Sequence, residues 1–345
     1  MQTSNHLSNS TYSPLSKRYD LMPYRQCGKS GLKLPAVSLG LWHNFGGDDS
    51  LENAVSIARY AFDNGVTHFD LANNYGPPPG SAEKTFGKIL SGDFRSHRDE
   101  LIISTKAGYD MWEGPYGNLG SRKHLIASID QSLKRLGTDY VDIFYHHRPD
   151  PDTPLTETMG ALDYIVRSGR ALYAGISNYD AEETEKAAAI LNELGTPLLI
   201  HQASYSMIDR WVENGLSSVC EKRGTGLIAF SPLAQGILSS RYLSGIPENS
   251  RAGGKSPFLG KKKVETWLPY VKALEEIANS REQTISQMAI SWLLAKSYVT
   301  SVLVGASSTK QLKENLSATD TIEFSKEELE KTEQLLLLLA PETSK

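Results

Sequence analysis

The chain has 345 residues, 39% of them hydrophobic and 22% charged, with a formal net charge of −4 at pH 7. This composition is typical of a water-soluble globular protein, and it offers no basic excess that would attract a nucleic acid or an anionic membrane. Its length fits one α/β barrel as well as it fits two smaller domains.

The two ends of the chain and its cysteines bear on the cellular compartment and the domain organisation that we expect. Residues 1–20 are rich in Ser and Asn and lack an apolar signal-peptide core, so we expect a flexible or surface-bound arm before one domain over residues 21–345. Cys27 and Cys220 form no C-x-x-C or zinc pattern, which favours a reduced, cytoplasmic chain. The apolar run 335–340 is too short to span a bilayer and predicts the buried end of a C-terminal helix or a subunit contact.

The predicted elements begin with two short strands about a turn within residues 24–37, which could close the bottom of a barrel. Short β-rich runs then alternate with segments of helical period, as in a parallel sheet with crossover helices. The predicted strands cover residues 37–42, 67–72, 100–106, 140–147, 171–177, 198–204, 226–231 and 300–306. Eight such repeats predict an α/β fold, a (β/α)8 TIM barrel with an N-terminal β-hairpin, a long loop after strand 7 and a C-terminal helix.

Helical spacing of apolar residues predicts helices over residues 50–65, 121–137, 155–169, 180–195 and 284–296. Ser121, Thr156 and Asp180 are the expected N-caps of three of them. The glycines expected just beyond helix C-termini are Gly65, Gly137, Gly169 and Gly195. Residues 235–263 form the longest irregular stretch, which predicts either a functional lid or disorder.

Polar side chains stand where the second, third and fourth strands end. Alternation along these strands puts Asp70, Lys106 and His147 on faces that converge if they point into the barrel. The same faces carry His68, Ser104, Ile102, Ile143 and Tyr145. Tyr75, five residues beyond Asp70, can fold back over the group. Each residue alone has a structural explanation, but a buried lysine and aspartate beside a tyrosine and a histidine predict a proton-transfer site.

These four side chains suit the reduction of a carbonyl group by hydride transfer. Tyr75 would protonate the developing alkoxide, and a Lys106 cation would stabilise its phenolate. Asp70 would orient Lys106, while His147 would hydrogen-bond the carbonyl oxygen. We expect no metal, because His146 and His147 point to opposite faces of their strand.

The segments FDLANNYG, ISTKAG, YVDIFYHHRPD, GISNY and AFSPLAQGIL, in this order, resemble the aldo-keto reductase superfamily. The resemblance covers residues 24–340 and implies a TIM barrel whose catalytic tetrad falls on Asp70, Tyr75, Lys106 and His147. SLGLWHNFG, NNYGPPPGSAE, STKAGYDMWEGPYG and GASSTKQLKEN resemble more narrowly the L-glyceraldehyde 3-phosphate reductase group, which is related to potassium-channel β subunits.

No G-x-G-x-x-G or complete P-loop motif is present, so a nucleotide needs another cradle. Barrels often bind phosphate on the loops after strands 7 and 8, here residues 231–242 and 305–315. The resemblance implies NADP (NADPH) rather than NAD, with Phe230 stacked on the nicotinamide. Relatives often have an arginine that meets the 2′-phosphate where this chain has Ser308, which leaves Lys310 or the loop at 251–263 to supply the positive charge. The implied cofactor-binding residues are Trp42, Asp70, Ser177, Asn178, Gln202, Phe230, Ser231, Pro232, Leu233, Ala234, Gln235, Gly236, Arg241, Arg251, Gly305, Ser307, Lys310, Gln311, Glu314 and Asn315.

The resemblance implies a small aldehyde substrate, such as glyceraldehyde 3-phosphate or methylglyoxal. The expected pocket is lined by Trp42, Tyr75, Tyr109, Trp112 and His147. Candidate partners of a substrate phosphate are Arg122, Lys123 and Arg148.

Two other functions are compatible with the sequence. A lysine at the end of a barrel strand could act as the Schiff-base nucleophile of a lyase, which would use Lys106. A nucleotide-sensing regulatory subunit of the channel β type is the second alternative. The apolar helix faces also permit a homo-oligomer, and relatives are commonly tetramers or octamers.

Overall fold

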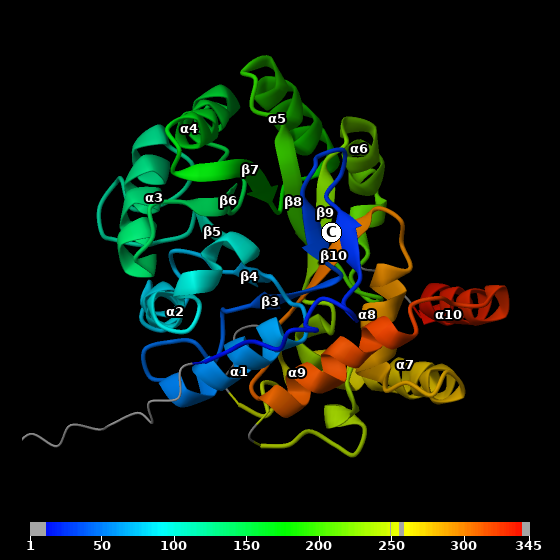
Figure 1. Ribbon diagram of the computed structural model, residues 1–345. Helices are drawn as coiled ribbons and strands as arrows, with labels where there is room; N and C mark the ends of the chain where they lie inside the picture. The colour runs from blue at the N-terminus through cyan, green and yellow to red at the C-terminus, as the bar shows by residue number, and fades with distance from the viewer. Residues whose placement is uncertain (1–11, 249, 255–258, 340–345) are drawn as a thin grey trace, which may run out of the picture.

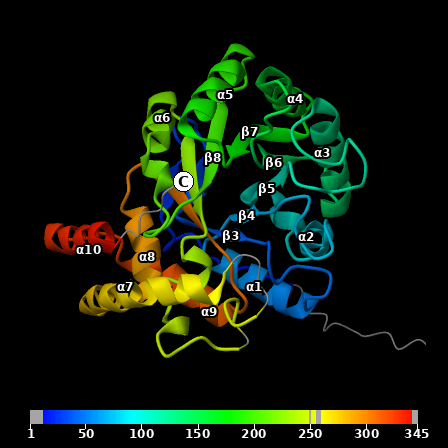
Figure 2. The same ribbon diagram turned by 180° about the vertical axis from the view of Figure 1, so that it is seen from behind.

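The computed structural model describes residues 12–248, 250–254 and 259–339. In these residues eight parallel strands close into a barrel in the order β10-β3-β4-β5-β6-β7-β8-β9, which confirms the predicted TIM barrel. Helices surround this barrel in Figure 1, and Figure 2 shows it from behind. The barrel strands are β3 (Val37–Gly40), β4 (His68–Asp70), β5 (Ile102–Ala107), β6 (Val141–His146), β7 (Ala171–Ser177), β8 (Leu198–Ser204), β9 (Gly226–Phe230) and β10 (Val299–Val304).

The helices bury their apolar faces against the outside of the barrel. In α1 the buried residues recur at helical spacing and include Ile57, Ala61 and Phe62. The helices are α1 (Leu51–Asp63), α2 (Ser81–Ser91), α3 (Arg122–Leu136), α4 (Leu155–Arg167), α5 (Ala181–Glu193), α6 (Leu216–Arg223), α7 (Lys261–Ser280), α8 (Ile285–Leu294), α9 (Thr309–Leu316) and α10 (Lys326–Leu339). Short 3-10 turns occur at Arg95–Glu100, Trp211–Glu213, Ala234–Gly236, Ser240–Tyr242 and Ser317–Asp320.

Two of the three predicted N-caps are confirmed. Ser121 accepts from the backbone N–H of His124, and Asp180 forms a reciprocal capping box with Glu183. The prediction for Thr156 is wrong, because α4 already begins at Leu155 after Pro154. The proline ring fixes a φ of −52°, which prepares the first helical turn without a side-chain cap.

The N-terminal hairpin closes the bottom of the barrel, as predicted. Strands β1 (Tyr24–Gln26) and β2 (Lys33–Pro35) pair antiparallel. Cys27 and Leu34 are fully buried in a cluster with Ile200 and Ile228, and the Lys29 N–H donates to the Gly224 carbonyl at 2.8 Å. In Figure 1 the hairpin lies in front of β9 and β10.

The chain ends pack on the outside of this barrel. The predicted arm over residues 1–20 lies partly outside the described residues; within them, the Tyr12 hydroxyl and the Leu15 N–H both donate to Asp63 at 2.9 Å. At the other end α10 packs on α7, with Leu336 buried and Leu337 74% exposed. None of the described helices is long and apolar enough to cross a membrane.

Candidate active site

Strand register brings the predicted acid and lysine together in the barrel lumen. Asp70 at the end of β4 lies opposite Ser104 of β5, and Lys106 lies two residues further along β5. Both charged side chains are fully buried. Lys106 Nζ lies 2.5 Å from Asp70 Oδ2, 2.6 Å from the Leu71 carbonyl oxygen and 3.3 Å from the Tyr75 hydroxyl. The three N–H groups of the ammonium therefore all have acceptors.

Tyr75 and His147 complete the predicted quartet from two loops. The Tyr75 ring lies between Trp42 and His147, with centroid distances of 5.9 Å to each. His147 follows β6, and its backbone N–H donates to the Ala107 carbonyl at 2.9 Å. The Tyr109 ring meets the His147 ring edge-on at 4.6 Å. The hydroxyl and the imidazole thus share one face of the barrel mouth.

Burial controls the protonation of this group. It raises the pKa of Tyr75 well above its usual value near 10, and the charge of Asp70 raises it further. Burial lowers the pKa of His147 well below 6.5, and the positive charges of Lys106 and Arg148 add to this effect. It also lowers the pKa of Lys106, against the attraction of Asp70. Tyr75 and His147 are therefore both neutral at pH 7, and each can donate a hydrogen bond.

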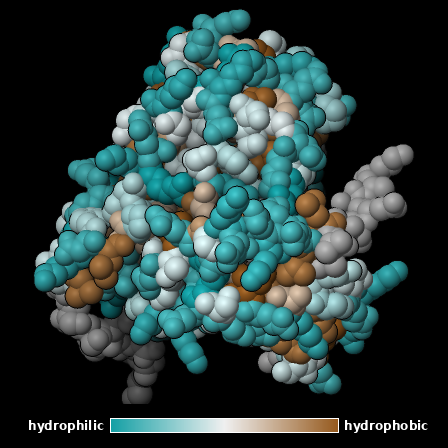
Figure 3. All heavy atoms as spheres, turned by 90° about the vertical axis from the view of Figure 1, so that its right-hand side faces the viewer, coloured by the Kyte–Doolittle hydropathy of each residue, from teal (hydrophilic) through white to brown (hydrophobic). Residues whose placement is uncertain are grey.

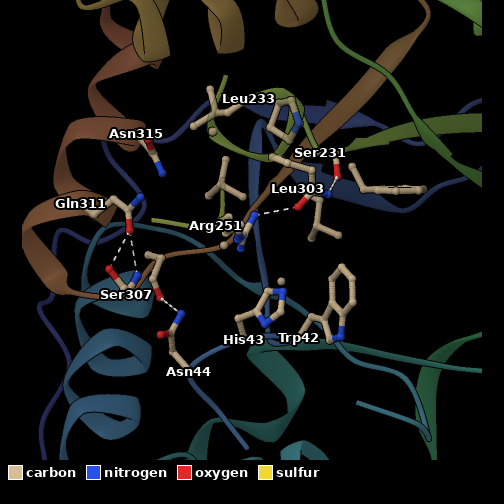
Figure 4. A pocket seen from close by; sticks show the side chains of 18 of the residues that line it. Trp42, His43, Asn44, Ser231, Leu233, Arg251, Leu303, Ser307, Gln311 and Asn315 are labelled. Carbon is tan, nitrogen blue, oxygen red and sulfur yellow. Dashed lines mark hydrogen bonds between the residues drawn. The ribbon is translucent and has the colours of Figure 1, made fainter. Parts of the chain in front are cut away.

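A cavity of about 900 Å³ opens above the quartet. Figure 4 shows its walls, which combine residues of the barrel mouth with two later loops. The sequence-predicted residues that line it are Trp42, Asp70, Tyr75, Tyr109, His147, Asn178, Gln202, Phe230, Ser231, Pro232, Leu233, Gln235, Gly236, Arg241, Arg251, Gly305, Ser307, Gln311, Glu314 and Asn315. Gln202 also donates to Asp70 Oδ1 at 3.1 Å, which links this wall to the ion pair.

The loop after β9 has an unusual backbone. Ser231, Ala234 and Gln235 have φ values of 54°, 46° and 62°, followed by Gly236 at 98°. Left-handed conformations at residues other than glycine cost energy and cluster at ligand sites. The N–H groups of Ala234 and Gly236 donate to the Ser231 and Leu233 carbonyls, each at 2.8 Å, and these bonds hold the loop in this conformation. Arg251 donates to the Gln235 side chain at 2.7 Å, so this loop also carries a positive charge to the cavity wall.

The second loop follows β10 and leads into α9. Gln311 Oε1 accepts from the Ser307 backbone N–H at 2.8 Å and from its hydroxyl at 3.1 Å, as Figure 4 shows. Ser308 is the N-cap of α9. The Asn315 side chain is buried, and its Nδ2 has no hydrogen-bond partner among the described residues. An unpaired buried amide in the cavity wall fits a polar ligand group.

Several predicted residues do not line the cavity. Trp112 packs on His124, with ring centroids 4.9 Å apart. Arg148 stacks behind the wall, 4.3 Å from the centre of the Tyr109 ring. Lys106 lies beneath the cavity, in contact with Asp70 and Tyr75. The others are Arg122, which donates to the Gly160 carbonyl; Lys123, which lies over the Tyr116 ring; Lys310, which is exposed; Ser177, whose hydroxyl accepts from Asn178; and Ala234.

Other lining residues are not among the sequence predictions. His43 stacks on Trp42 at 4.4 Å, and Asn44 holds the loop after β10 through the Ala306 carbonyl at 3.2 Å. Both residues follow the end of β3, and this position after the first barrel strand is the sequence feature from which a place in the cavity wall could have been predicted. Further lining residues are Gly40, Asn74, Ser239, Ser240, Tyr242, Ser286, Leu303, Val304 and Ala306.

Comparisons with known proteins agree with this geometry. Residues 36–337 match the aldo/keto reductase family. The chain is 58% identical over 323 residues to an L-glyceraldehyde 3-phosphate reductase of Escherichia coli O157:H7, covering 92% of this chain and 93% of that protein. Its counterpart in Escherichia coli K12 is 57% identical over the same length. A probable voltage-gated potassium channel subunit beta of Arabidopsis thaliana is 37% identical over 309 residues, 87% of this chain and 92% of that protein.

Proposed function

The chain belongs to the aldo/keto reductase family, and we propose that it reduces small aldehydes to alcohols with NADPH. The observation that carries this proposal is the contact of the Tyr75 hydroxyl with Lys106 Nζ at 3.3 Å, beside His147 on the floor of the cavity. A neutral phenol next to a buried cation is a proton donor whose conjugate base is stabilised where it forms.

Each side chain of the quartet then has one task. His147 and Tyr75 hydrogen-bond the carbonyl oxygen and fix the orientation of the aldehyde. Tyr75 gives its proton to that oxygen as negative charge develops there, and Lys106 stabilises the phenolate that remains. Asp70 keeps Lys106 charged in the barrel interior. NADPH, when bound, supplies the hydride that adds to the carbonyl carbon.

The cavity walls fit a dinucleotide. The positive charge of Arg251 beside the loop at 231–236 suits the phosphate groups, while the unpaired Asn315 amide suits the adenine end. Phe230, Asn178 and Gln202 would hold the nicotinamide. Since Ser308 caps α9, we assign preference for NADPH over NADH to Arg241 and Arg251, the arginines in the cavity wall among the described residues.

The substrate class is proposed from the relatives' printed name and from the aromatic mouth of the cavity. Trp42, Tyr75 and Tyr109 leave space suited to a short aldehyde. Glyceraldehyde 3-phosphate and methylglyoxal are the first candidates, the second implying a role in aldehyde detoxification. Arg148 would reach a substrate phosphate only after leaving the Tyr109 ring, so we expect the phosphate to add little to affinity.

The test is the loss of NADPH absorbance when the purified protein meets methylglyoxal and, separately, glyceraldehyde 3-phosphate. An NADH series and the variant Tyr75→Phe serve as controls. We expect oxidation that requires Tyr75 and is faster with NADPH. Tight NADPH binding without reduction of either aldehyde would refute the proposal and favour a nucleotide-sensing subunit.

The lyase alternative is disfavoured by the surroundings of Lys106. Its Nζ is fully buried and engaged by Asp70, Leu71 and Tyr75, so it lacks the free, neutral amine that Schiff-base chemistry needs. Borohydride trapping of an aldehyde on Lys106 would contradict this conclusion.

We further propose a cytoplasmic homo-oligomer. Both cysteines are buried and unpaired, as in a reduced compartment. Figure 3 shows the side of the molecule that carries α10. This surface is largely hydrophilic and has separate apolar patches. The exposed Leu337 of α10 supports a subunit contact there. Light scattering on the purified protein would test whether it forms tetramers or octamers.

A further inference from the structure

A chain of hydrogen bonds runs through the barrel lumen below the quartet. It joins four strands, β10, β3, β4 and β5, and all its side chains are fully buried. The contacts are Ser301 Oγ to Ser38 Oγ at 2.7 Å, Ser38 Oγ to His68 Nδ1 at 2.9 Å, His68 Nε2 to Ser104 Oγ at 2.9 Å, and Ser104 Oγ to Asp70 Oδ1 at 2.6 Å. Buried polar residues are costly unless paired, so this continuous pairing calls for an explanation.

The carboxylate fixes the direction of every bond in the chain. Ionised Asp70 can only accept, so the Ser104 hydroxyl donates to it. Ser104 must then accept from His68, which places the ring hydrogen on Nε2. His68 Nδ1 is left to accept from Ser38, and Ser38 accepts from Ser301. All members therefore donate toward Asp70.

The lower end of the chain is closed to water. Ser301 Oγ also lies 3.3 Å from the Ala36 carbonyl, and the buried residues Cys27 and Leu34 seal the lumen beneath. Burial lowers the pKa of His68 to about 4, so its ring is neutral at the pH of the reaction. A chain with a sealed end and a neutral histidine holds hydrogen-bond geometry and offers no route for protons from solvent.

We propose that His68 is a positioning residue that acts through Ser104 to hold Asp70 Oδ1, leaving Asp70 Oδ2 to Lys106; its catalytic consequence rests on the proposed reductase function. Gln202 also donates to Asp70 Oδ1, at 3.1 Å against 2.6 Å for Ser104, so the Ser104 bond is the shorter of the two that hold this oxygen. The Asp70 carboxylate selects this tautomer through Ser104, and Ser38 supplies the hydrogen bond that the acceptor Nδ1 needs. With the hydrogen on Nδ1 instead, Nε2 would take the Ser104 hydrogen away from Asp70. A less firmly held Asp70 stabilises the Lys106 cation less, so Lys106 would lose its proton at a lower pH. Besides Asp70, the charged or titratable neighbours of Lys106 are Tyr75, Glu83, Tyr145, His147 and His68 itself.

The variants are chosen away from the cavity, which none of the residues Ser38, His68 and Ser104 lines. Ser38→Ala leaves the buried His68 Nδ1 without its donor, His68→Leu removes the donor to Ser104, and His68→Gln restores an N–H donor toward Ser104. Thr105→Val is the matched control. Thr105 is equally buried on the opposite face of the same strand, and its hydroxyl donates to the Glu83 carboxylate at 2.6 Å.

We expect kcat to fall about 3- to 10-fold in Ser38→Ala and about 10-fold or more in His68→Leu, the usual effect of losing a buried hydrogen bond. The alkaline limb of the kcat profile should move to lower pH in both variants, while the NADPH Kd stays within about twofold. His68→Gln should recover most of the activity of His68→Leu, and Thr105→Val should retain the wild-type profile.

Ring-labelled ¹⁵N histidine spectra of the full chain provide a readout that does not depend on turnover. The His68 signal, assigned by its loss in His68→Gln, should show hydrogen on Nε2 in the wild type and in Ser38→Ala, and a mixture of tautomers in Ser104→Ala, which disconnects the ring from the carboxylate. Hydrogen on Nδ1 in the wild type would overturn the proposal. So would an unchanged alkaline limb in both Ser38→Ala and His68→Leu, or an equal loss in Thr105→Val. If the protein reduces no aldehyde, the proposed function fails, but the tautomer of His68 seen in these spectra still tests the positioning role independently.

Discussion

Replacement of Tyr75 by phenylalanine separates catalysis from stability. The variant loses one contact of 3.3 Å to Lys106 Nζ, which keeps Asp70 Oδ2 at 2.5 Å and the Leu71 carbonyl at 2.6 Å. The ring can still stack on Trp42. We therefore expect the free energy of unfolding to change by less than about 1 kcal/mol. Loss of a general acid should lower kcat by about 10²–10⁴, or about 3–5 kcal/mol of transition-state stabilisation.

The assay pairs NADPH oxidation at saturating aldehyde with urea unfolding and a fluorescence titration of NADPH. Tyr179→Phe is the matched control: it removes another buried hydroxyl, 2.5 Å from His146 Nδ1, that lies outside the cavity wall. We expect this control to lose stability and keep kcat. Full activity in Tyr75→Phe would mean that another group gives the proton. A parallel loss of stability and activity in Tyr75→Phe would refute the assigned role as well.

Three further predictions concern charge. Lys106→Met should abolish reduction, and it should lower the free energy of unfolding by about 3–5 kcal/mol because it leaves the buried Asp70 charge unpaired. The double variant with Asp70→Asn should recover the stability in urea titrations but not the activity. Arg251→Gln should raise the Kd of NADPH about tenfold in fluorescence titrations, with a smaller change for NADH. Burial lowers the pKa of His146 to about 3 and of His201 to about 4. Between about pH 6.5 and 4 the unfolded chain thus binds protons that the folded chain does not. The free energy of unfolding should therefore fall by about 1.4 kcal/mol per pH unit for each histidine as the pH drops. His201→Gln should reduce this pH dependence in urea titrations at pH 7 and 5.

The positions of the quartet were predictable because two rules of strand geometry act together. Alternation puts Asp70 and Lys106 on inward faces, and the closed barrel brings the ends of neighbouring strands to one mouth. The third acceptor of Lys106 was not predictable from these rules. It is the Leu71 carbonyl, whose direction depends on how the chain turns beyond β4.

Loop positions lay beyond the reach of periodicity. Trp112 was expected in the substrate pocket, yet it packs on His124 because the loop after β5 folds back onto α3. The loop at 231–236 was expected in the cavity wall, but its left-handed backbone was not. Three of its left-handed residues, Ser231, Ala234 and Gln235, are not glycines, so no glycine pattern in the sequence predicts this backbone conformation. Such strain is stabilised by tertiary contacts that a local pattern does not contain.

The reactivity of the quartet comes from burial as much as from residue identity. In water, tyrosine and histidine differ in charge behaviour, since histidine titrates near neutral pH and tyrosine near pH 10. In this cavity burial raises the pKa of Tyr75 and lowers that of His147, so both are neutral donors where the proposed reaction would place the carbonyl oxygen. The buried cation beside them, Lys106, is already compensated by Asp70. Negative charge that develops on the substrate oxygen therefore meets two hydrogen bonds and a nearby positive charge without a prior proton transfer, which is the electrostatic arrangement that carbonyl reduction requires.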